Sequence, residues 1–259
     1  MFGFFRKKKE KDSATPRVES ILCIPGKWKD REALLYAIVE ASAGEYIMAG
    51  LVLMHTKTKT SFQILVEPKK ELLRLTFQYS GLVNGVSEQF LEQIDAHEQI
   101  VYLIAETGSY VKAKAFALAG NIILKAGGIG IHVESAGKTF EKAQWSEMMD
   151  NYQEHYLYTM FVHDSIMDEE GNLFSCGMHH LGLKDTIIYG ENKEHLQQTL
   201  HVWGVYQVVD KPHIKLGETF SVAIDAPIFK IKKKVHPPYE GHELLNNPFG
   251  MWALREIKP

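Results

Sequence analysis

Residues 99–134 read QIVYLIAETGSYVKAKAFALAGNIILKAGGIGIHVE, and this stretch decides the fold. It begins with a run of β-branched and aromatic residues from Ile100 to Ala105, which is typical of a strand covered on both faces. A second apolar run, Ile129 to Val133, follows about one helix length later. The two runs and the segment between them predict a β-α-β unit.

The helix between these two strands is expected to pack closely against its sheet. Thr107 or Ser109 can cap its first turn, and Gly127-Gly128 supplies a left-handed residue that ends it. Its apolar residues recur at spacings of three and four and are mostly small: Ala113, Phe116, Ala117, Gly120, Ile123 and Leu124. If the two strands are parallel neighbours, the crossover between them is right-handed.

The carboxyl ends of these strands are where a ligand of such a sheet would bind. Polar side chains follow both strands there, and they define the candidate ligand-binding residues Glu106, Thr107, His132, Glu134 and Lys138. This pattern gives the position of a site and identifies no chemistry.

The remaining periodicity predicts an α+β protein in which strand-helix-hairpin modules flank the central β-α-β unit in one mixed sheet. The predicted strands before the unit are Val18–Ile24, Tyr46–His55 and Ser61–Glu67, with helices at Asp30–Ala43, 69–80 and 87–97. After the unit, helices are predicted at Thr139–Met149 and Glu194–Val208, and strands at Tyr156–Met167, Leu173–His179, Phe220–Ile224 and Ile228–Lys234.

The last of these strands carries four lysines and is expected to be a sheet edge, because charge there discourages pairing with another chain. Asn246–Trp252 is expected to dock back on the body. We expect residues 1–16 to form a mobile basic tail and residues 17–259 a single α+β domain, with 17–67 and 173–234 as a candidate pseudo-repeat.

Charge and composition exclude some classes of function. With 29 basic and 32 acidic residues, the chain has no overall field that would favour nucleic acid. Residues 1–12 carry a net charge of +3, so the remainder carries −6. Three Phe residues and five cations in that tail would hold a membrane only weakly, and no stable membrane association is predicted. Two cysteines, Cys23 and Cys176, are too few for a disulfide framework and indicate a reducing cytoplasm.

Several motifs that suggest chemistry fail on inspection. Ala136–Thr139 ends like a phosphate-binding loop, but the Gly required five residues before Gly137 is His132. Adjacent His179 and His180 in a strand would point to opposite faces and could not share an ion. His132 and Glu134 share a face, but no third ligand is fixed by the sequence. We therefore predict no metal and no cofactor.

Three further stretches resemble a bacterial family that is classified only as a domain of unknown function. They comprise Ala115, Ala119, Gly127, Gly128, Gly130-Ile131-His132 and Gly137, then Cys176–Asp185, and finally Asn247–Trp252. The resemblance covers most of the chain after residue 17. It implies a bacterial cytoplasmic protein of accessory or immunity type and assigns no activity to any residue.

Two hypotheses for function follow. The first is a non-catalytic cytoplasmic binding or interaction protein with a protein partner, since no catalytic constellation accompanies the lysine-rich edge and the acidic remainder. The alternative is a hydrolase or small-ligand-binding enzyme with its site at the strand ends near His132 and Glu134. The sequence leaves the partner, the ligand, the oligomeric state and the presence of enzyme activity open.

Overall fold

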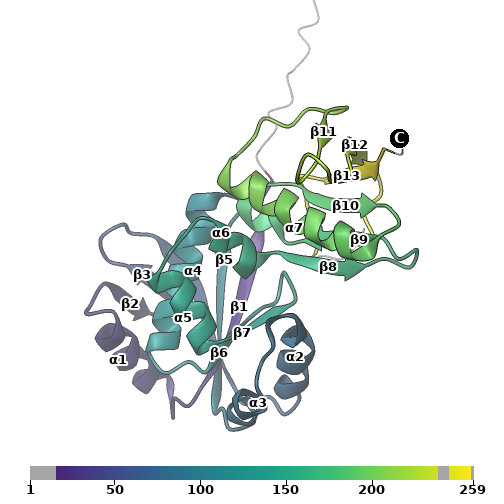
Figure 1. Ribbon diagram of the computed structural model, residues 1–259. Helices are drawn as coiled ribbons and strands as arrows, with labels where there is room; N and C mark the ends of the chain where they lie inside the picture. Colours follow the sequence, from purple (N-terminus) through teal and green to yellow (C-terminus); the bar gives the residue numbers. More distant parts are fainter. Residues whose placement is uncertain (1–15, 239–244, 258–259) are drawn as a thin grey trace, which may run out of the picture.

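The chain folds into two sheets that are joined through their helices (Figure 1). The computed structural model describes residues 16–238 and 245–257, so the predicted tail lies outside the described residues except for Pro16. The first sheet has the strand order β2-β3-β4-β5-β1-β6-β7 and is antiparallel throughout. The second, with the order β11-β12-β13-β10-β9-β8, is mixed because β10 and β13 are parallel. The α+β class is confirmed.

The strands of the first sheet are β1 (Glu19–Gly26), β2 (Tyr46–Ala49), β3 (Val52–His55), β4 (Ser61–Pro68), β5 (Gln99–Glu106), β6 (Gly130–Val133) and β7 (Lys138–Glu141). Those of the second are β8 (His163–Met167), β9 (Leu173–Cys176), β10 (Asp185–Tyr189), β11 (Thr219–Phe220), β12 (Phe229–Lys234) and β13 (Met251–Glu256). The helices are α1 (Arg31–Ala41), α2 (Leu73–Ser80), α3 (Glu88–Asp95), α4 (Tyr110–Lys125), α5 (Lys142–Asp150), α6 (His155–Phe161) and α7 (Lys193–Val209), with short 3₁₀ helices η1 (Leu82–Asn84) and η2 (Met178–Leu181).

The central unit β5-α4-β6 is present, but its two strands are not neighbours. Strand β1 lies between them and is antiparallel to both, with Leu22 opposite Leu103 on one side and Val133 on the other. The unit is therefore a split β-α-β. Because β5 and β6 still run in the same direction, their carboxyl ends meet at the same edge of the sheet.

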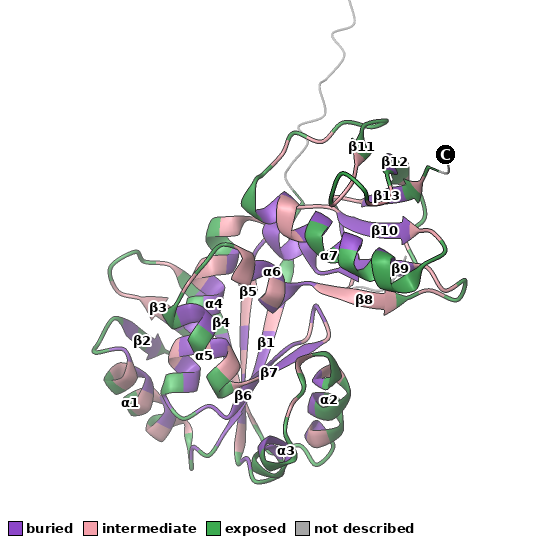
Figure 2. Cartoon of the chain, in the orientation of Figure 1, coloured by how far each residue is buried: buried purple, intermediate pink, exposed green. Residues whose placement is uncertain are grey.

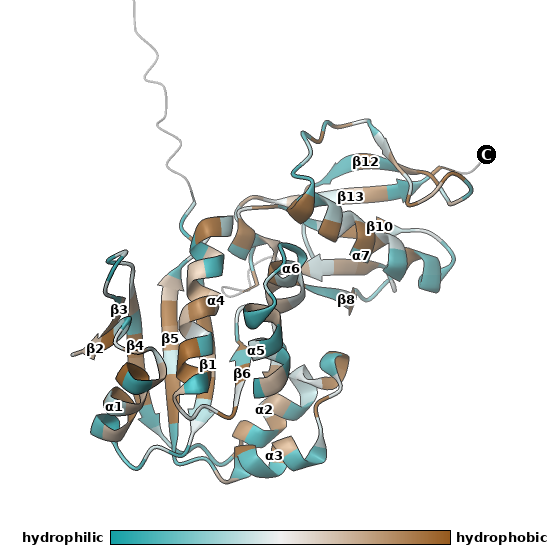
Figure 3. Ribbon diagram, turned by 60° about the vertical axis from the view of Figure 1, so that its left-hand side comes forward, coloured by the Kyte–Doolittle hydropathy of each residue, from teal (hydrophilic) through white to brown (hydrophobic). Residues whose placement is uncertain are grey.

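Helix α4 packs on this unit as its small residues predict. Ser109, not Thr107, caps it by accepting a hydrogen bond from the Lys112 N–H. Its stripe is buried, and a Cβ at Gly120 would come within 2.8 Å of Leu22, so the helix approaches β1 as closely as glycine allows. Figure 3 shows α4 and α5 in front of the strands. On the opposite face α2 and α3 cover Cys23, Ile100 and Ile129.

Local predictions fail at five places in the chain. The strand predicted over Phe220–Ile224 is only the two-residue β11. The strand predicted over Tyr46–His55 is the hairpin β2-β3, which turns at Gly50 with a φ of 53°. The helix predicted from Thr139 begins at Lys142, because residues 138–141 pair with β6. Residues 155–161, predicted as strand, form helix α6 with its apolar residues at helical spacing. The strand predicted to His179 ends at Cys176, where Gly177 adopts a φ of 117° and η2 begins.

The strands after α6 form a sheet of their own, whereas one sheet was predicted. Strand β12, predicted as an edge, pairs along its length with β13 and at its first two residues with β11. Strand β10 was not predicted. The terminal segment docks on the body as expected and does so as strand β13, between β10 and β12. The stretches 17–67 and 173–234 contribute strands to different sheets.

The loop after β5 and the loop after η2 touch through two glycines. The Gly108 N–H donates to the His180 carbonyl at 3.0 Å. Gly182 has a φ of 77°, and a Cβ there would lie 2.5 Å from the Gly108 carbonyl oxygen. This backbone contact joins the two sheets and requires glycine at position 182.

Gly182→Ala should therefore lower the free energy of unfolding by about 2–4 kcal/mol. The cost of a left-handed φ for alanine and the cost of the clash between its Cβ and the backbone both contribute. Gly50→Ala is the matched control, because Gly50 also has a positive φ but its Cβ would meet nothing within 4 Å. That variant should lose only about 1 kcal/mol in urea unfolding. Equal losses in the two variants would show that the contact with Gly108 contributes nothing.

Candidate functional site

The five residues predicted at the strand ends do not converge on one site. Glu106 is exposed at the end of β5 and pairs with Lys112 at 2.6 Å. His132 and Lys138 are both buried, but they lie on opposite faces of the sheet, since His132 is opposite Thr139 in the pairing of β6 with β7. Glu134 lies half-buried just after β6, and burial raises the pKa of its carboxyl.

Thr107 belongs to a buried hydrogen-bonded cluster that joins the first sheet to η2. The Ser20 hydroxyl, on β1, lies 2.5 Å from the Thr107 hydroxyl and 2.5 Å from Nδ1 of His180. The ring of His179 lies 4.2 Å from that of His180 between centroids. Burial lowers the pKa of His179 to about 4 and that of His180 well below its ordinary value, so both imidazoles are neutral.

A serine hydroxyl beside an imidazole is the arrangement that activates a nucleophile. In this cluster Ser20 and His180 are 0% exposed, so a substrate has no route to the hydroxyl. The pair instead connects β1, β5 and η2 by hydrogen bonds in a dry interior, where an unpaired polar group is costly. We assign it a structural role.

A second polar network lies where α6, β7, β8 and α7 meet. The carboxylate of Asp164 accepts hydrogen bonds from the Tyr158 hydroxyl and from Nδ1 of His201, both at 2.8 Å. Burial opposes its ionisation, but these bonds hold the pKa of Asp164 below its ordinary value. The same hydrogen bond raises the pKa of His201. The network thus favours a charged His201–Asp164 pair.

Lys138 contributes a buried ammonium group near this network. Its Nζ donates to the carbonyl oxygens of Thr159 at 2.6 Å and Val162 at 2.9 Å. Burial lowers the pKa of Lys138 to about 8, and the Asp164 carboxylate favours its charged form. Because both acceptors belong to the end of α6, Lys138 fixes that helix terminus against β7.

No arrangement for metal binding is found in residues 16–238 and 245–257, where no three His, Cys, Asp or Glu side chains are placed to hold an ion. His132, which was considered as a metal ligand with Glu134, packs on Phe77 and lies with Nδ1 3.1 Å from the Thr139 hydroxyl. Both cysteines are buried free thiols whose pKa burial raises. Within the same ranges, no helix combines the length and hydrophobicity needed to cross a bilayer.

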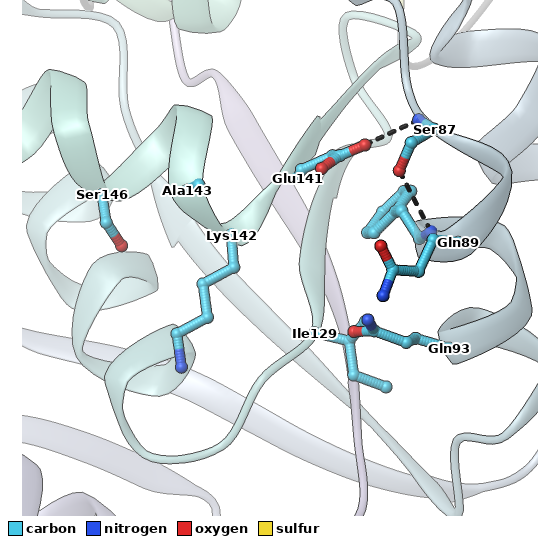
Figure 4. Close-up of a pocket in the computed structure, with 9 residues that line it drawn as sticks. Ser87, Gln89, Gln93, Ile129, Glu141, Lys142, Ala143 and Ser146 are labelled. Atoms are coloured by element: carbon cyan, nitrogen blue, oxygen red, sulfur yellow. Dashed lines mark hydrogen bonds between the residues drawn. The ribbon is translucent and has the colours of Figure 1, made fainter.

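An open cleft of about 420 Å³ lies between α3 and α5 (Figure 4). Gln89 and Gln93 line it from α3 and Lys142 from α5. The Glu141 carboxylate accepts from the Ser87 N–H at 2.6 Å, so it is engaged at the start of α3. The cleft offers amides and an ammonium group for polar contacts and contains no acid–base pair for catalysis.

Helix α2 has exposed as well as buried residues (Figure 2), and several of the exposed ones are large and apolar. Its buried face, with Leu73 and Phe77, packs on α3. The exposed face continues into η1, and we call it the α2–η1 stripe. It consists of large apolar side chains that are 46–72% exposed: Leu72, Leu75, Tyr79, Leu82 and Val83. Their spacings of three and four place them on one side of the helix.

Comparisons with models of protein families, with curated proteins and with solved structures gave no match. The resemblance to a bacterial family therefore stays a prediction. The functional conclusions below rest on the geometry of this chain alone.

Sequence reasoning missed Ser20, Asp164 and His201. Their contacts join segments far apart in the chain, and no local spacing indicates them. The α2–η1 stripe, by contrast, carries a local signal, because residues 72–83 contain two apolar faces at helical spacing and a helix on a surface needs only one.

The buried histidines predict an acid-labile fold. The pKa values of His132 and His179 are about 4 in the folded state, below the ordinary value that applies when unfolded. The unfolded chain therefore binds more protons, and the stability present above the unfolded pKa of about 6.5 is lost as the pH falls towards 4. His201 opposes this trend, but it is half exposed and its effect is smaller.

The free energy of unfolding should fall by about 3 kcal/mol between about pH 7 and about pH 5 in urea titrations. His179→Gln should remove about a third of this dependence, because buried His132 and His180 share it. A stability that is flat over this range would contradict the neutral, buried state of these imidazoles.

Proposed function

We propose that this protein is a non-catalytic interaction protein and that the α2–η1 stripe binds a partner protein through an apolar, uncharged helix face. The observation that carries the proposal is the stripe itself. Contiguous exposed apolar surface on a soluble protein marks interaction sites more often than scattered apolar residues do.

The helices that carry the stripe are fixed to the first sheet by hydrogen bonds. Ser80, at the end of α2, lies with its hydroxyl 2.6 Å from that of Thr139, and the Asn84 amide donates to the Thr139 carbonyl at 2.6 Å. These bonds attach α2 and η1 to β7, an edge strand of the first sheet. A partner would therefore meet a surface that is already ordered, which reduces the entropy lost on binding.

The charges around the stripe favour an uncharged partner face. Arg74, a cation within α2, is directed away from the stripe, where it pairs with Asp95 at 2.8 Å and also with Glu88. Lys70 pairs with Glu67 at 2.6 Å. Because these two cations are already neutralised, an apolar helix can dock beside them, with the exposed carboxylate of Glu71, next to Leu72, left at the solvated rim of the interface.

The enzyme hypothesis has less support. Its residues His132 and Lys138 are buried on opposite faces, and the serine–histidine pair is closed to solvent. The resemblance to bacterial accessory and immunity-type proteins agrees with a binding role, and a cytoplasmic location forms part of the proposal.

Tyr79→Glu should weaken binding of the partner, because it places a carboxylate at the centre of the stripe. Tyr36→Glu is the matched control, since Tyr36 on α1 is similarly exposed, at 64% against 72% for Tyr79. Native mass spectrometry of protein purified from its own cells should show a stoichiometric partner with the wild type and Tyr36→Glu. The dissociation constant for that partner should rise about tenfold or more in Tyr79→Glu.

Two outcomes would overturn the proposal. One is a partner that binds both variants as tightly as the wild type, which would move the interface elsewhere. The other is a dimer of this chain that Tyr79→Glu dissociates, which would make the stripe a contact between two copies. Circular dichroism should confirm that both variants remain folded.

A further inference from the structure

Basic side chains gather on strands β12 and β13, at the side of the second sheet that is farther from the first sheet (Figure 1). We call four of them the β12 basic face: Lys230, Lys232, Lys234 and Arg255. We propose that this face binds an acidic, extended segment of a partner protein. The inference goes beyond the α2–η1 stripe, which is apolar and shares no residue with this face.

The pairing of β12 with β13 places the four cations on one side of the sheet. Residues two apart on a strand point to the same face, so Lys230, Lys232 and Lys234 lie together. Arg255 is directly opposite Lys230 in the antiparallel register, and such neighbours point to the same side. The Tyr189 ring on β10 agrees with this placement, because Arg255 lies 4.1 Å and the Lys234 ammonium group 5.8 Å from its centroid.

The positive charge of the β12 basic face is not neutralised within the protein. Lys230, Lys232 and Arg255 are exposed, and Lys234 is partly exposed. No ion pair formed within residues 16–238 and 245–257 includes any of the four. Asp168 lines an open cleft together with Lys234, but its carboxylate already accepts hydrogen bonds from Asn172. The charge of this face is therefore available to a partner.

The arrangement of the cations is unfavourable for the free protein. Like charges directly opposite each other on neighbouring strands are destabilising, and Lys230 and Arg255 form such a pair. Lysines often protect a sheet edge from pairing with other strands. That role does not explain this pair, because β11 pairs with β12 at Lys230, and β13 lies between β12 and β10. An anionic partner would relieve the repulsion.

The spacing of the cations fits an extended peptide. Side chains on one face of any β-strand are about 6–7 Å apart, so acidic residues at every second position of a partner segment would match Lys230, Lys232 and Lys234. A single-stranded nucleic acid also carries regularly spaced anions, but it gains affinity by stacking its bases on open aromatic rings. The Tyr189 ring on this face already carries two cations. These observations favour an acidic protein segment.

The test uses a synthetic peptide of alternating glutamate and threonine as the probe, on the full chain at low salt. The peptide should bind in saturable fluorescence-anisotropy titrations, and added salt should weaken it. A peptide with glutamine in place of glutamate should not bind. In Lys230→Glu the new carboxylate faces Arg255, so one substitution removes one cation and neutralises a second. The dissociation constant of the acidic peptide should rise roughly tenfold in this variant.

Lys27→Glu is the matched control, because Lys27 is also exposed, follows β1 of the first sheet and gives the same change in net charge. It should leave binding of the acidic peptide unchanged. Urea unfolding separates binding from a structural role. Lys230→Glu should unfold at the same urea concentration as the wild type or a higher one, because it relieves the repulsion from Arg255.

Three results would overturn the proposal. The first is an acidic peptide that binds Lys230→Glu as tightly as the wild type. The second is a lower urea midpoint for Lys230→Glu, which would give this cation a structural role. The third is tighter binding of oligothymidylate, or of vesicles that contain anionic lipid, than of the acidic peptide, because the face would then select nucleic acid or a membrane surface.

Discussion

The hydrogen bonds at Ser20 and His180 are the interaction on which the rest of the structure depends. They join β1, the strand inserted at the centre of the split unit, to η2, the first element after β9 of the second sheet. The hydrogen bond between Ser20 and His180 requires two conditions. The imidazole must be neutral, since a buried charge without a partner is costly, and the loops must approach closely enough for Gly108 and Gly182 to touch. Burial provides the first condition and glycine the second.

This constraint explains why the polar groups of the predicted site form hydrogen bonds within the protein. Ligands bind where the strand ends of an open sheet are exposed. Here the second sheet and its helices cover the edge where β5 and β6 end, so Thr107 and Lys138 form hydrogen bonds within the protein. The same residue types at an uncovered edge would be a plausible active site. What distinguishes the two cases is long-range packing, which no spacing along the chain reveals.

The sequence predicted what depends on local periodicity. Helix α4 and its stripe of small residues follow from spacing and composition, as do the α+β class and the docking of Asn246–Trp252, whereas the choice of Ser109 over Thr107 as the cap does not. It failed where a distant segment decides the outcome. Nothing between Gln99 and Glu134 indicates that β1 inserts between β5 and β6. His179 and His180 were dismissed as ligands on the premise of a strand, whereas Gly177 ends β9 and starts a 3₁₀ helix.

The search for function rests on two rules of protein stability, one for apolar surface and one for buried polar groups. In a stable monomer, apolar surface is buried and buried polar groups are paired, so departures from these rules identify where selection has favoured something other than stability. The α2–η1 stripe departs from the first rule and the buried Nε2 of Gln207, which has no hydrogen-bond partner among the described residues, from the second. In the His180 cluster Ser20 pairs with Nδ1 of His180, whereas Nε2 of His180 and Nδ1 of His179 have no hydrogen-bond partner among the described residues. The cluster is closed to solvent, whereas a partner can reach the stripe, and this difference in exposure is the physical reason for seeking function at the stripe.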